Sequence, residues 1–89
     1  MQGVVVYEVA IKPDRADDFD AELDQMVEGT KSDPDFVKGW WFSDGGVGYA
    51  VIQLTDETVA KRWADEAAIP PEATVSLTRA SSYRLEREA

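Results

Sequence analysis

Two strand-like segments flank the tripeptide Asp44-Gly45-Gly46, and this arrangement restricts the fold more than any other feature of the chain. Residues 36–43 and 47–54 are rich in aromatic and β-branched side chains, which predicts two strands joined by a two-residue hairpin turn. The turn is Asp44-Gly45 or Gly45-Gly46, and both have an even length, so both predict the same two faces. One face would carry Phe36, Lys38, Trp40, Phe42, Tyr49, Val51 and Gln53, and the other Val37, Gly39, Trp41, Ser43, Gly48, Ala50, Ile52 and Leu54.

The segments before and after this hairpin alternate between strand and helix. Residues 3–12 have the alternation of a strand, and residues 13–29 have helical spacing between Pro13 and Gly29. A second helix is predicted to begin after Thr55 or Asp56 as its N-cap and to run to about Ala68. Residues 75–87 form the last predicted strand, in which residues 80–82 are a candidate bulge.

The resulting order, β-α-β-β-α-β, predicts an α+β fold of the ferredoxin-like type. Two right-handed crossovers around a hairpin place four strands in one antiparallel sheet, in the order fourth, first, third, second, with both helices on one face. Val5 and Tyr7 on the first strand, and the hairpin face that carries Trp41, are expected to meet the helices. A chain of 89 residues is expected to form a single domain, residues 1–89.

The other face of the predicted sheet has no helix left to cover it. It would carry Val6, Trp40, Phe42, Tyr49 and Val51, together with Glu8 and Lys38. An apolar patch of this size on a small protein predicts an interface, and a two-fold homodimer is the most common closed solution. Glu8 and Lys38 would then pair with each other or across the dimer, the alternative being a catalytic carboxylate in a dry cavity.

Composition excludes several classes of function. The chain contains no cysteine and no histidine, so we expect no thiolate or imidazole metal site and no cofactor held by such ligands. Eighteen acidic and nine basic residues give a net charge of −9, which argues against nucleic acid and anionic membranes as partners. The acidic helix face, formed by Asp14, Asp17, Asp18 and Glu22, is interpreted as solvated, the alternative being a divalent-metal site. The cytoplasm is the expected location.

Several short segments resemble one known family across nearly the whole chain. They are Ala10-Ile11-Lys12-Pro13, a helix with Phe19 and Leu23, Asp33-Pro34-Asp35-Phe36, and Thr55-Asp56-Glu57-Thr58-Val59-Ala60. This pattern is similar to the antibiotic biosynthesis monooxygenase-like branch of the dimeric α/β-barrel superfamily. The resemblance implies a homodimer with a pocket between the sheet and the helices of each subunit.

The same resemblance implies a cofactor-independent oxygenase of small phenolic compounds. Trp63 matches the position of a tryptophan that these oxygenases often use, whereas Tyr7 stands where they often have an asparagine. Haem-degrading members need an axial histidine after the second helix, and this chain has none. The reaction would need no metal or flavin, because a phenolate can itself react with dioxygen.

Four residues are candidates for the site. Trp41 and Trp63 are either core anchors or walls that stack on a flat substrate, and Tyr7 either donates to a backbone carbonyl or steadies a developing oxyanion. Arg79 either supplies positive charge to the same pocket or offsets the acidic surface. The resemblance therefore implies a phenol monooxygenase with Tyr7 as the catalytic residue; the alternative is a non-catalytic small-ligand-binding or structural homodimer.

Overall fold

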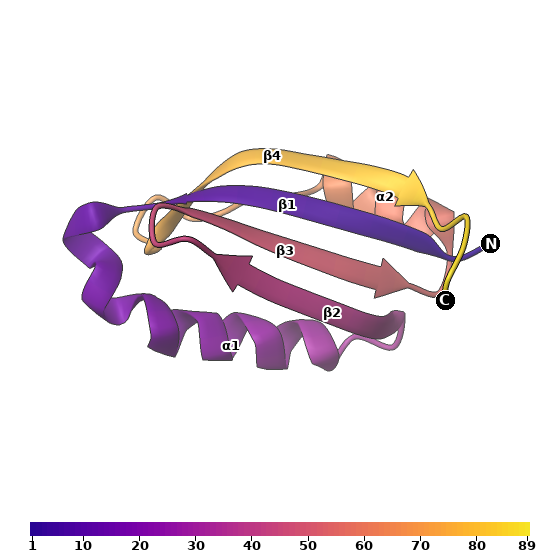
Figure 1. Ribbon diagram of the computed structural model, residues 1–89, viewed down its shortest axis with the longest axis horizontal. Helices are drawn as coiled ribbons and strands as arrows, with labels where there is room; N and C mark the ends of the chain where they lie inside the picture. The colour runs from indigo at the N-terminus through magenta and orange to yellow at the C-terminus, as the bar shows by residue number, and fades with distance from the viewer.

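A computed structural model describes all residues from Met1 to Ala89, and its elements follow the predicted order. They are β1 (Gly3–Ile11), the 3₁₀ helix η1 (Pro13–Asp18), α1 (Phe19–Lys31), β2 (Phe36–Ser43), β3 (Val47–Leu54), α2 (Glu57–Asp65) and β4 (Val75–Arg84). The four strands form one antiparallel sheet in the order β2-β3-β1-β4 (Figure 1). The α+β, ferredoxin-like fold and the predicted strand order are thus confirmed.

The hairpin between β2 and β3 has the predicted strand bounds and an even-length turn. The amide of Asp44 donates to the carbonyl of Val47 at 3.2 Å, which leaves Gly45-Gly46 as the two-residue loop. Gly45 has a φ of +96°, a conformation that glycine adopts without steric cost. The side chain of Asp44 accepts from the amides of Gly46 and Val47 and so satisfies the turn. The register therefore places Trp40 and Phe42 on the face opposite to Trp41, as predicted.

One hairpin residue lies on a different face from the one predicted. The register of β2 against β3 shifts between Phe36 and Lys38, so Phe36 lies opposite Leu54. This bulge turns the Phe36 ring toward the core on the helix face, where it packs near Leu54. The placement of Phe36 on the open face was therefore wrong, because strict alternation assumes an unbroken ladder.

The first helix does not begin as an α-helix. Residues 13–18 form the 3₁₀ helix η1, whose first bond runs from the amide of Arg15 to the carbonyl of Lys12. Three aspartates in this segment favour local turns over α-helix, and a 3₁₀ start is common at helix N-termini. At its other end α1 continues past Gly29 to Lys31, so the predicted stop at Gly29 was two residues early.

The second helix begins as predicted and ends earlier. Asp56 is its N-cap, and the Asp56 carboxylate accepts from the amide of Thr58 at 2.7 Å. The helix ends at Asp65 rather than near Ala68, after bonds from the amides of Glu66 and Ala67 to carbonyls within its last turn. The chain then leaves the helix axis, which brings residues 66–69 beside the sheet.

The core lies between the sheet and α2. It consists of Val5, Ile52, Leu54 and Ala60, each of them buried. By contrast, α1 contains no buried residue and runs alongside the edge strand β2 (Figure 1). A space therefore remains between α1 and the sheet. Neither helix has the length and apolar character needed to cross a bilayer.

Candidate functional site

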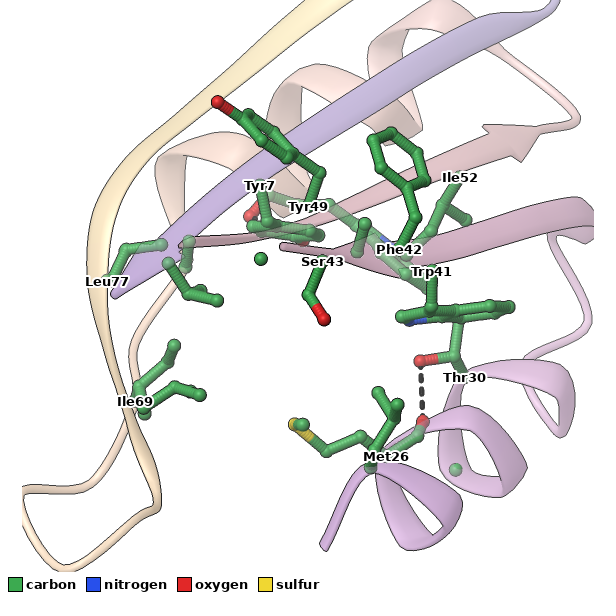
Figure 2. A pocket seen from close by; sticks show the side chains of 18 of the residues that line it. Tyr7, Met26, Thr30, Trp41, Phe42, Ser43, Tyr49, Ile52, Ile69 and Leu77 are labelled. Atoms are coloured by element: carbon green, nitrogen blue, oxygen red, sulfur yellow. Dashed lines mark hydrogen bonds between the residues drawn. The ribbon is translucent and has the colours of Figure 1, made fainter. Parts of the chain in front are cut away.

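The space between the sheet and the two helices is a cavity of about 770 Å³. Its lining is mostly apolar and comes from every strand and both helices, including Tyr7, Val9, Trp41, Ser43, Gly48, Ala50, Ile52, Leu77, Phe19, Leu23, Met26 and Trp63. In Figure 2 the side chains of Met26, Ser43, Ile69 and Leu77 point toward its centre. A cavity of this size and lining is typical of a small-molecule site.

Two aromatic residues at the edge of the cavity do not point into it. The rings of Phe42 and Tyr49 point away from the centre of the cavity (Figure 2), onto the open face of the sheet. They stack on each other there with ring centroids 5.5 Å apart. The two faces of the sheet therefore present separate aromatic surfaces.

The helix α1 is held off the sheet by contacts with the loop before β4. The carboxylate of Glu22 accepts from the amide of Thr74, at 2.9 Å for its nearer oxygen, and also from the Thr74 hydroxyl. Thr74 itself is buried. Nearby, Lys12 Nζ donates to the carbonyl of Pro71 and Arg15 Nη1 to the carbonyl of Glu72. These bonds tie the segment from Lys12 to Glu22 to the loop before β4, outside the lining of the cavity. Glu22 is therefore hydrogen-bonded, and the prediction that it belongs to a solvated acidic face was wrong.

Three of the four predicted site residues lie together. Tyr7, Trp41 and Trp63 all line the cavity, and all three also pack against the edge of the core. The Tyr7 hydroxyl donates to the backbone carbonyl of Trp63 over a long distance of 3.5 Å. A backbone carbonyl is the partner that we expected if Tyr7 has a structural role. Burial raises the pKa of the Tyr7 phenol, so this hydroxyl is neutral at pH 7 and acts there as a hydrogen-bond donor.

The fourth predicted residue, Arg79, lies on the other face of the sheet. The register of β4 against β1 shifts between Glu8 and Val9, so Leu77 lies opposite Val9 while Arg79 lies opposite Glu8. Thr78 is the extra residue of this bulge. Without it, Leu77 and Arg79 would share the cavity face. The prediction that Arg79 supplies charge to the cavity was therefore wrong. The candidate bulge at residues 80–82 was also wrong, because the register shifts at Thr78 instead. The strand β4 ends at Arg84 rather than at the predicted Arg87.

Sequence reasoning missed the carboxylates of the cavity. Asp20, Asp33 and Glu66 belong to its lining. Helical spacing gave a signal for two of them, because Asp20 lies three residues before Leu23, and Glu66 three residues after Trp63. No group of three or more acidic side chains is arranged to hold a metal ion.

The fold resembles two solved structures. The crystal structure of MupZ from Pseudomonas fluorescens matches with a TM-score of 0.68 and 13% identity, over 91% of this chain and 66% of that one. The crystal structure of PA3566 from Pseudomonas aeruginosa matches with a TM-score of 0.64 and 15% identity, over 99% and 95% of the two chains. No protein-family model matches the chain, and no curated protein matches its sequence. At these identities the likeness shows the shared fold alone.

Proposed function

We propose that this protein binds a small, flat, largely apolar organic molecule between its sheet and its helices. The observation that carries the proposal is the cavity of about 770 Å³, whose walls include the indoles of Trp41 and Trp63. Indole rings bury a large area against a flat ligand and favour stacked geometry. The hydroxyls of Tyr7 and Ser43 supply a few polar contacts, which is the balance found in small-molecule sites.

A titration with methylanthracene, followed by the fluorescence of the probe, tests this proposal. Ser43→Phe fills the cavity from the end of β2, where Ser43 is exposed, and is expected to abolish binding. Ser76→Phe is the matched control, because Ser76 is exposed on the opposite face, facing Ala10, and does not line the cavity. Absence of binding to the wild-type protein, or equal loss in both variants, contradicts the proposal.

A finer proposal follows the resemblance to the antibiotic biosynthesis monooxygenase-like branch. In it, the bound molecule is an electron-rich phenol that reacts with dioxygen, with Tyr7 as the catalytic polar group. The Tyr7–Trp63 contact and the shared cavity support this arrangement. The position of Arg79 opposite Glu8 removes the only cation we expected to stabilise a phenolate.

Oxygen uptake distinguishes the oxygenase from a binding protein. Hydroxylated anthracenes and naphthalenes are supplied to the wild-type protein and to its Tyr7→Phe and Trp63→Phe variants. The oxygenase proposal expects uptake above that of buffer and a loss in both variants. A protein that binds methylanthracene and consumes no oxygen is a binding protein.

We also propose that a second copy of the chain covers the open face of the sheet. Four large side chains are exposed there: Trp40 (44%), Phe42 (54%), Tyr49 (37%) and Tyr83 (55%). Lys38 pairs with Gln53 on β3 and lies over the Trp40 ring, at 5.3 Å from its centroid. Glu8 pairs with Tyr49, four positions away from Gln53 along β3. Charges of opposite sign at separate positions on one face suit a two-fold interface, because the rotation can bring Lys38 of one copy near Glu8 of the other.

Light scattering at micromolar concentration tests the dimer. The expected mass is twice the 9.9 kDa of the chain, and Phe42→Lys is expected to give the single-chain mass. A wild-type protein that is monomeric contradicts the proposal.

A further inference from the structure

The cavity carries negative charge and no positive charge. Its three ionisable acidic side chains are Asp20, Asp33 and Glu66, and none of the nine lysines and arginines lines it. Carboxylates are ionised at neutral pH. The apolar walls are of low polarity, so charges at the margin act on a bound molecule more strongly than they would in open water.

Four of the nine basic residues are directed away from the cavity. Lys12 and Arg15 donate to the carbonyls of the loop before β4, at 2.6 Å in both cases, and do not line the cavity. Arg79 lies on the opposite face, and Lys38 is over the Trp40 ring on that same face. The lining of the cavity would therefore offer an anionic ligand no counter-charge.

Two of the three carboxylates are free to meet a ligand. Asp33 accepts from the amide of Asp35 at 2.8 Å and so stabilises the turn after α1. Asp20 and Glu66 are exposed and take part in none of the ion pairs of the chain. They come from different elements, since Asp20 lies in the first turn of α1 and Glu66 directly follows α2. The margin of the cavity thus offers two carboxylates to a cation whose apolar part lies inside.

The apolar part of the cavity also suits a cation. The indoles of Trp41 and Trp63 line it, and an ammonium or a delocalised cation is attracted to the face of an indole ring. By contrast, the side-chain donors of the lining that could meet an anion are all neutral. They are the Ser43 hydroxyl and the indole N–H groups of Trp41 and Trp63, because the hydroxyls of Tyr7 and Thr30 already donate to the carbonyls of Trp63 and Met26.

We infer that the cavity selects an aromatic molecule with an amine on an alkyl side chain, which is protonated at neutral pH, with its ring against the indoles and its ammonium near Asp20 and Glu66. This inference rests on the proposed function, because it names the chemical class of the molecule that the cavity binds. It predicts discrimination by charge at constant shape: cationic first, neutral second, anionic last.

Three probes of one shape test the inference. They are anthracenes that carry an ammoniomethyl (–CH₂–NH₃⁺), a hydroxymethyl or a carboxylate group at the same ring position. Exposed ion pairs are individually weak, so two such carboxylates predict about tenfold tighter binding of the ammonium than of the carboxylate, with the alcohol between them. The difference should shrink as ionic strength rises, whereas the contribution of ring burial should not.

A charge-matched pair of variants separates the cavity from the net charge of the protein. Asp20→Asn combined with Glu66→Gln is expected to bring the three dissociation constants within about twofold of one another. Asp24→Asn combined with Glu72→Gln changes the net charge equally at exposed positions outside the cavity and should keep the full discrimination.

Each outcome decides a separate claim. Equal binding of the three probes overturns the inference and leaves the proposed binding function in place. An equal loss of discrimination in both double variants also overturns it, because the effect then comes from the overall charge. Failure of all three probes to bind overturns the proposed function and, with it, the inference.

Discussion

Gly39 leaves space for the Trp41 indole, so Gly39→Ala is expected to disturb one wall of the cavity. The two residues lie on the same face of β2, two positions apart. A methyl group on Gly39 would lie 2.6 Å from Cη2 and 2.8 Å from Cζ3 of the indole. Ordinary contact begins near 3.4 Å, so the ring must move by about 0.8 Å or more.

The size of the effect follows from what has to move. The clashing atoms are the far end of a side chain, so the ring is displaced before the backbone, and overpacking of this kind costs roughly 1–3 kcal/mol of stability. Because Trp41 lines the cavity, a flat ligand also loses part of its stacking surface. Stacking is worth roughly 0.5–1.5 kcal/mol, which corresponds to about a two- to tenfold loss of affinity.

The assay combines urea unfolding with a methylanthracene titration, each measured in two backgrounds. In the wild-type background, Gly39→Ala should lower both the stability and the affinity. In the Trp41→Ala background only Phe36 Cε2, at 3.2 Å, remains close to the added methyl, so the same substitution should have a much smaller effect. Equal penalties in the two backgrounds would show that the clash with Trp41 is not the cause and would refute the reasoning.

Two further predictions concern the stability of the fold. Gly3→Ala would place a methyl 2.6 Å from the Cα of Glu57, so α2 must move and urea unfolding should show a loss of roughly 1–3 kcal/mol; Gly29→Ala, whose methyl meets nothing within 4 Å, should show none. Hydrogen bonds from turn amides lower the pKa of Asp44, and bonds from Thr58 lower the pKa of Asp56, relative to the ordinary value of 3.8. The ionised carboxylates therefore stabilise the folded state above a pH of 3.8, and the urea midpoint of unfolding should fall as the pH drops below about 4. Asp44→Asn combined with Asp56→Asn should weaken this pH dependence. An unchanged pH profile in that variant would contradict the role given to these two carboxylates.

The order of elements and the hairpin could be predicted because they depend on local patterns. The alternation of residues 3–12, the turn at Gly45-Gly46 and the cap at Asp56 are each fixed by neighbouring residues. The opposite faces of Trp40 and Trp41 followed from the even length of the turn, whereas their pairing with Val51 and Ala50 also required Gly45-Gly46 to be the loop.

The faces of Phe36 and Arg79 could not be predicted, because each depends on a bulge. A bulge adds one residue to one strand and reverses the face of every residue beyond it. The bulge between Phe36 and Lys38 has no local sequence signal. It occurs where the Phe36 ring packs near Leu54 in the core. The bulge at Thr78 decides whether the guanidinium of Arg79 lies on the cavity face of the sheet or on the open face. One inserted residue thus changes the predicted chemistry of the site.

The cavity itself could not be distinguished from a filled core. Phe19, Leu23 and Met26 have the spacing of a helix that packs on a sheet, and the same spacing lines an open cavity. What separates the two cases is the distance of α1 from the sheet. That distance is set by long-range bonds such as the one from Thr74 to Glu22, which are separated by 52 positions in the sequence.

The most direct test of the account is an NMR titration that follows the three indole N–H signals, because they report separately on the two faces of the sheet. Trp41 and Trp63 line the cavity, whereas Trp40 is exposed on the open face. Addition of methylanthracene to labelled protein is predicted to shift the signals of Trp41 and Trp63 and to leave that of Trp40 unchanged. A shift of the Trp40 signal alone, or no shift of any of the three, would contradict binding between the sheet and the helices.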